Sequence, residues 1–163
     1  MKLVIRLGVI LCAVFAAVTI AVFALMLVFA GVESRQDQVL ATLGKYDSKE
    51  FWTHGAFQDY TDYAKYQFSS VSFEGNPYFS VVSESDLPII RAFLDNFEKW
   101  VASIKETDAA DELAISYDFD RSLMDAGDFF YLYEDEDYPK FGCYDLYFFD
   151  SQTQVLYYFH SNI

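Results

Sequence analysis

The stretch Asp86–Lys105, DLPIIRAFLDNFEKWVASIK, carries the clearest helical pattern in the chain. Apolar residues recur along it every three or four positions, a spacing that places them on one face of an α-helix. These residues are Ile90, Phe93, Leu94, Phe97, Val101 and Ile104. Asp86 suits the N-cap position, and Pro88 is tolerated in the first turn. The pattern predicts a helix whose apolar face is buried against a sheet.

Short runs rich in aromatic and β-branched residues predict six strands around this helix. Before it, residues 63–73 and 78–82 flank the turn signal Gly75-Asn76-Pro77 and predict a hairpin, with a bulge near Ser69-Ser70. After it, the predicted strands are residues 113–119, 129–133, 144–149 and 155–160. The last two are apolar on both faces, which is typical of inner strands with a helix on one face.

The N-terminal region contains a run of 26 residues without a charged side chain, Leu7–Val32. As a helix rising about 1.5 Å per residue, this run is longer than the roughly 30 Å hydrocarbon core of a bilayer. Lys2 and Arg6 precede it, and an excess of Lys and Arg marks the cytoplasmic side. We expect residues 1–32 to be a cytoplasmic N-terminus and a single-pass signal anchor in the cell membrane, with the remaining chain outside the cytoplasm.

A cleaved secretory signal peptide is the alternative interpretation, because that class also has a basic start and an apolar segment. Val28-Phe29-Ala30 offers residues for the −3 and −1 positions of a cleavage site. The apolar region of a signal peptide spans about 7–15 residues, however, and the run here is far longer. We therefore prefer a retained transmembrane helix that contacts the lipid bilayer through residues 7–32.

The order β-β-α-β-β-β-β with short connections predicts an α+β fold, in which one main helix packs on an antiparallel sheet in two layers. We assign this extracytoplasmic domain to residues 63–163. Residues 33–62 are predicted to be a juxtamembrane helical stalk or linker. Within it, Gly44 suits the end of a first helix, and Ser48 suits the cap of a second, short helix.

The composition of residues 33–163 limits the partners that we expect. This part holds all 25 acidic residues and nine of the eleven basic ones, a net charge of −16. Such a charge repels nucleic acid and attracts basic partners. Aromatic residues make up 20% of the chain, and surplus tyrosine suits binding surfaces. Cys143 is the only cysteine beyond the anchor, so the domain is expected to fold by packing without an internal disulfide.

Clustered aspartates form a weak candidate metal site. Asp118 and Asp120 alternate on one face of a predicted strand, and Asp125 and Asp128 follow in the next loop. If these carboxylates converge, they would offer oxygen ligands to Ca²⁺. The spacing does not fit an EF-hand, because Leu123 stands where that loop requires glycine. The alternative, which we prefer, is a solvated acidic edge that opposes edge-to-edge association of sheets.

Sequence motifs for catalysis are missing from this chain: it has no nucleophile elbow, zinc-protease motif, phosphate-binding loop or paired-cysteine metal site. Its two histidines, His54 and His160, are far apart in sequence. We therefore predict no catalytic or cofactor-binding residue, and expect a membrane-anchored extracytoplasmic binding module. An immunity-type or inhibitor protein acting on a basic partner is one form of it. The alternatives are an envelope hydrolase that uses Asp118 and Asp120, or a structural subunit of a membrane complex.

Overall fold

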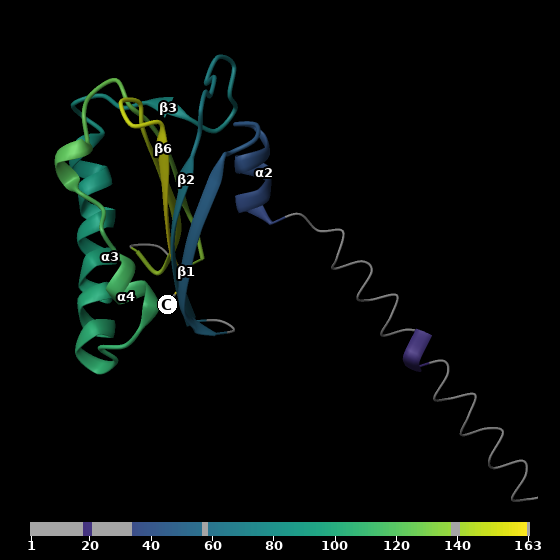
Figure 1. Cartoon of the computed structure of the whole chain (residues 1–163), viewed down its shortest axis with the longest axis vertical. Helices are drawn as coiled ribbons and strands as arrows, with labels where there is room; N and C mark the ends of the chain where they lie inside the picture. Colours follow the sequence, from purple (N-terminus) through teal and green to yellow (C-terminus); the bar gives the residue numbers. More distant parts are fainter. Residues whose placement is uncertain (1–17, 21–33, 57–58, 138–140, 163) are drawn as a thin grey trace, which may run out of the picture. The chain divides into compact units, whose positions relative to one another are not determined.

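The computed structural model describes residues 18–20, 34–56, 59–137 and 141–162 (Figure 1). The predicted cytoplasmic N-terminus and most of the predicted anchor lie outside these residues. Residues 18–20 are α-helical. Among the described residues, no helix is long and apolar enough to cross a membrane. The chain divides into two compact units, Met1–Thr42 and Leu43–Ile163.

The first unit contains the short helix α2, Arg35–Ala41, in the range where the sequence predicts a helical stalk. Ser34 caps its N-terminus, because the Ser34 hydroxyl accepts a hydrogen bond of 3.1 Å from the backbone N–H of Asp37. This bond satisfies one of the amide donors that the first turn of a helix leaves unpaired. The prediction of a helix that ends shortly before Gly44 is therefore confirmed.

The second unit is built on an antiparallel sheet with helices, which confirms the predicted α+β class. Within the described residues the sheet has six strands in the order β1-β2-β6-β5-β4-β3. Their bounds are β1 Ser48–Ala56, β2 Asp59–Gln67, β3 Ser80–Val81, β4 Phe129–Glu134, β5 Cys143–Asp150 and β6 Val155–Asn162. The C-terminal strand β6 thus lies between β2 and β5, in the interior of the sheet.

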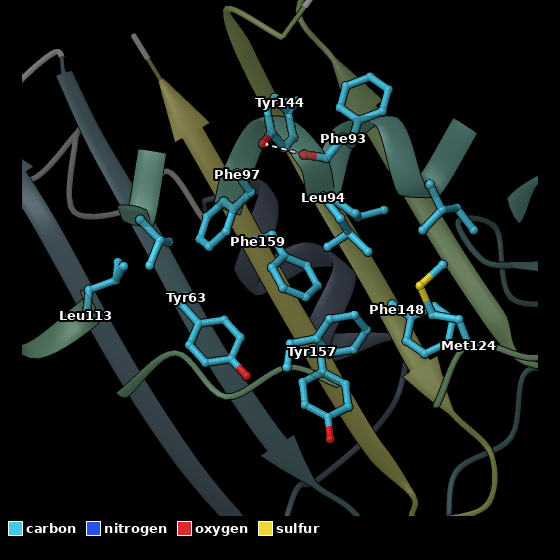
Figure 2. Packing of buried hydrophobic residues seen from close by; sticks show 14 of the residues in the cluster. Tyr63, Phe93, Leu94, Phe97, Leu113, Met124, Tyr144, Phe148, Tyr157 and Phe159 are labelled. Atoms are coloured by element: carbon cyan, nitrogen blue, oxygen red, sulfur yellow. Dashed lines mark hydrogen bonds between the residues drawn. The ribbon is translucent and has the colours of Figure 1, made fainter. Parts of the chain in front are cut away.

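Helix α3, Leu87–Thr107, confirms the predicted helix and packs along one face of the sheet, next to the short helix α4, Glu112–Ser116 (Figure 1). Phe97 of α3 is fully buried and meets Phe159 of β6, with ring centroids 5.3 Å apart in an edge-to-face arrangement (Figure 2). The Tyr144 hydroxyl of β5 donates a hydrogen bond of 3.2 Å to the carbonyl oxygen of Phe93. The main core therefore lies between α3 and strands β2, β6 and β5.

The predicted hairpin of residues 63–73 and 78–82 is wrong. Strand β2 ends at Gln67, and β3 consists of Ser80–Val81 and pairs with β4. Phe73 lies in the connection between β2 and β3, where its ring stacks on Phe129 at 4.0 Å and contacts Phe149 at 4.9 Å. These aromatic contacts pack the half-buried Phe73 ring against β4 and β5, in place of the predicted pairing with residues 78–82.

Two further predictions are wrong, and each concerns the type of an element. The predicted strand 113–119 contains the helix α4, which begins because the Asp111 carboxylate accepts a hydrogen bond of 3.0 Å from the backbone N–H of Ala114. The predicted short helix at Ser48 is the strand β1, which pairs with β2 along its whole length. Strand β1 and the first residues of β2 thus lie in the range 33–62 that the sequence assigns to a linker.

Candidate functional site

A pocket of about 220 Å³ lies between the paired ends of β1 and β2 and the C-terminal half of α3. Trp100 and Ile104 form an apolar wall, and the Trp100 side chain remains 37% exposed. Apolar walls with a few polar groups are typical of ligand sites, and this volume suits one side chain or a small organic group. The lining residues are His54, Gly55, Asp59, Tyr60, Thr61, Trp100, Ser103, Ile104 and Thr107.

His54 is held in place at this pocket by an aspartate. Its Nδ1 lies 2.7 Å from Oδ2 of Asp111, the residue that also caps α4. Burial opposes ionisation of Asp111, but the hydrogen bonds from His54 and from the Ala114 N–H outweigh it, so the pKa of Asp111 lies below its usual value. Because a carboxylate only accepts hydrogen bonds, Nδ1 of His54 is the donor. Nε2 is then the atom of His54 that a ligand can meet.

Gly55 has a left-handed backbone conformation beside the pocket. Its φ angle is +89°, and a Cβ atom at this position would overlap the carbonyl oxygen of Asp59. Only glycine combines this left-handed conformation with such a close approach of two backbones. The pairing of Gly55 with Tyr60, and of His54 with Thr61, therefore depends on a residue without a side chain.

Asp118 and Asp120 have different hydrogen-bond partners. The Asp118 carboxylate accepts hydrogen bonds of 2.8 Å from the Tyr63 hydroxyl and from Nζ of Lys65. Asp120 accepts a 2.8 Å bond from the backbone N–H of Ser122 and so caps a short 3₁₀ helix. Each of the two carboxylates therefore has local hydrogen-bond partners of its own.

Asp125 and Asp128 lie close together in the following loop. Asp128 is buried and accepts hydrogen bonds of 3.0 Å from the backbone N–H groups of Asp125 and Ser151. Asp128 thus ties its own loop to the connection between β5 and β6. Within the part of the chain that the structure describes, no group of three or more His, Cys, Asp or Glu residues is arranged to hold a metal ion.

The sequence did not reveal the pocket, because its lining residues come from two distant segments, residues 54–61 and 100–107, and Asp111 holds His54 from outside the lining. His54 and Asp111 are 57 positions apart. His54 falls in a range predicted to be a linker, and Asp111 precedes a segment predicted to be a strand. The one usable signal was Asp111 itself, since aspartate is a preferred N-cap residue and a helix after it would have placed α4 correctly.

No family model matches this chain, and it has no significant match among curated proteins or among solved structures. Since a fold alone does not define a function, what the protein does has to be inferred from the chemistry of its own sites.

Proposed function

We propose that the protein is a membrane-anchored extracytoplasmic binding module, and that its pocket receives a basic side chain of a protein partner. The observation that carries the proposal is that the partly exposed Trp100 and the acidic residue Asp59 line the same pocket. The face of an indole attracts cations, and a carboxylate complements an ammonium or guanidinium group. A lysine or arginine side chain therefore matches both walls.

The charge of the chain supports the same class of partner. Residues 33–163 carry a net charge of −16, which raises the association rate of a basic partner and repels acidic ones. The apolar run Leu7–Val32 supports the membrane location. We do not carry the hydrolase alternative forward, because Asp118 is paired with Lys65 and Asp120 caps a helix.

A titration of the full-length chain in a non-ionic detergent with a tetralysine peptide tests the proposal. We expect the indole N–H signal of Trp100 to shift in ¹⁵N-correlated NMR spectra as the peptide binds. Trp100→Ala should weaken binding by about 2- to 30-fold, the range that a cation–indole contact contributes. Asp59→Asn should weaken binding most at low salt, because screening already reduces this attraction at high salt.

The matched control is Ile115→Ala, because Ile115 is an apolar side chain that is 64% exposed and does not line the pocket. This variant should bind the peptide as the unchanged chain does. If Trp100→Ala and Ile115→Ala bind tetralysine equally well, the proposed pocket for a basic side chain is wrong.

A further inference from the structure

Three titratable residues lie side by side across the interior of the sheet. His160 of β6 pairs directly with Asp62 of β2 on one side and with Asp145 of β5 on the other. Directly opposed residues of antiparallel strands share a face. This face is opposite the one that packs on α3, because the neighbours Tyr63 and Phe159 belong to the main core. We call these three residues the Asp–His–Asp row, and all three are buried.

The hydrogen bonds of the row leave one nitrogen unsatisfied. Oδ1 of Asp145 lies 2.7 Å from Nδ1 of His160 and accepts a 2.8 Å bond from the Tyr158 hydroxyl. Since a carboxylate only accepts, Nδ1 of His160 donates this bond, and Nε2 is an acceptor wherever it carries no proton. Nε2 is buried and has no hydrogen-bond partner among the described residues. A buried acceptor without a donor destabilises the folded chain, so a donor close to this atom would stabilise it.

Asp62 is the nearest group in the row that could become this donor. Its pKa lies above the usual value, chiefly because burial disfavours the charged form, and repulsion by Asp145 adds to the shift. The hydrogen bond from the Thr53 hydroxyl and the charge of Lys49 oppose the shift by favouring the ionised carboxylate. A protonated Asp62 would gain an O–H group directly opposite the imidazole, where facing Cβ atoms are about 4.5–5.5 Å apart.

Other titratable groups that face the row are Tyr60 of β2, Cys143 of β5 and Tyr158 of β6. Burial, followed by repulsion from the aspartates, raises the pKa of both tyrosines, so they stay neutral in the range where carboxylates titrate. The Tyr60 ring stacks on His160 with a centroid separation of 4.6 Å and also lines the pocket. Tyr60 thus connects the row to the candidate site.

We propose that Asp62 takes up one proton from solvent as the pH falls, and that the carboxyl O–H formed in this way donates a hydrogen bond to Nε2 of His160. The added proton completes a continuous hydrogen-bonded chain from Thr53 through Asp62 and His160 to Asp145. The row is then a pH-sensitive element of the extracytoplasmic unit. This inference does not depend on the partner proposed for the pocket.

The sign of the effect on stability follows from the raised pKa of Asp62. The folded chain binds this proton more tightly than the unfolded chain does, so protonation stabilises the fold. The stabilisation is fully present below the ordinary pKa of an aspartate, about 3.9, and is lost as the pH rises through the raised value. Ionised Asp62 therefore destabilises the folded chain at neutral pH.

The test is a pH titration of the full-length chain in a non-ionic detergent, observed by NMR of the Asp62 carboxyl carbon and of the histidine ring nitrogens. We expect the Asp62 carboxyl signal and the Nε2 signal of His160 to change in one common step, at a pH above the ordinary range of aspartate. In Asp62→Asn this step of the Nε2 signal should disappear. In Glu84→Gln, the control at an exposed carboxylate outside both the row and the pocket, the step should remain.

Thr53→Val keeps the proposal testable if Asp62→Asn does not fold. It removes the hydroxyl that favours ionised Asp62, so the common step should move to higher pH. The proposal is overturned if the Asp62 and His160 signals change in separate steps, or if the Nε2 step is the same in Asp62→Asn as in the unchanged chain. A step that does not move in Thr53→Val would also contradict it.

Discussion

Replacing Phe97 with alanine removes the ring that joins α3 to the centre of the sheet. Phe97 is fully buried, and its centroid lies 5.3 Å from that of Phe159, 5.6 Å from Tyr117 and 6.5 Å from Tyr63. Loss of a buried phenylalanine side chain costs about 3–5 kcal/mol. Aromatic pairs add roughly 0.5–1.5 kcal/mol each beyond burial, so we expect the upper half of that range. The total free energy of unfolding of a domain is only about 5–15 kcal/mol.

The assay is urea denaturation of the full-length chain in detergent, monitored by circular dichroism. In a parallel thermal melt, the midpoint should fall by about 12–25 °C, at roughly 3–5 °C for each kcal/mol in a unit of this length. The matched control is Ile89→Ala on the same helix, because Ile89 is 50% exposed. It should change the free energy of unfolding by no more than about 0.5 kcal/mol. Similar losses for Phe97→Ala and Ile89→Ala would refute the packing of α3 on the sheet.

Three further predictions concern polar and backbone features. Gly55→Ala should lower the free energy of unfolding, measured by urea denaturation, by more than about 1 kcal/mol and disturb the pocket, because the new Cβ overlaps the Asp59 carbonyl oxygen. An unchanged midpoint would contradict the close approach of Gly55 to Asp59. Asp128→Ala should cost about 2–4 kcal/mol, since it leaves two backbone N–H groups without their acceptor, whereas the exposed Asp120→Ala should cost less. The pKa of Asp111 is lowered, so the ionised Asp111 stabilises the fold above the ordinary aspartate range, and this stabilisation is lost as the pH falls through the lowered pKa. Asp111→Asn should therefore reduce the fall in the free energy of unfolding at acidic pH. An unchanged fall would refute the pairing of Asp111 with His54.

Periodicity predicted the elements whose own side chains determine how they pack. Helix α3 has its apolar residues at helical spacing, and β5 and β6 are apolar on both faces, so their burial follows from their composition. The segment that starts at Leu113 shows the limit of this reasoning. Its alternation predicted that Leu113 and Ile115 share a buried face, yet Leu113 is fully buried and Ile115 is 64% exposed. The Asp111 cap and contacts with the core favour one helical turn over the strand pattern.

Strand β1 could not be predicted from its own residues. Ser48 followed by charged and aromatic residues also suits a helix start, and only pairing with β2 makes the segment a strand. The pairing of Asp145 with His160 was missed by one residue. The predicted strands 144–149 and 155–160 would pair Phe149 with Val155 and so place Asp145 opposite Phe159, whereas in the structure Asp150 pairs with Val155 and Asp145 with His160. Such an error of one residue moves a side chain to the other face of the sheet.

The two histidines lie in adjacent rows of the sheet. His54 pairs with Thr61, and His160 pairs with the next residue, Asp62. Tyr60 precedes both on β2, lines the pocket and stacks on His160. A ligand that displaces the backbone of Tyr60 would therefore change the surroundings of Asp62 and its proton uptake. Because such coupling is reciprocal for binding free energies, the proton would then change the affinity of the pocket by the same factor. Peptide binding measured above and below the Asp62 step detects this coupling, and equal affinities would show that the two sites are independent.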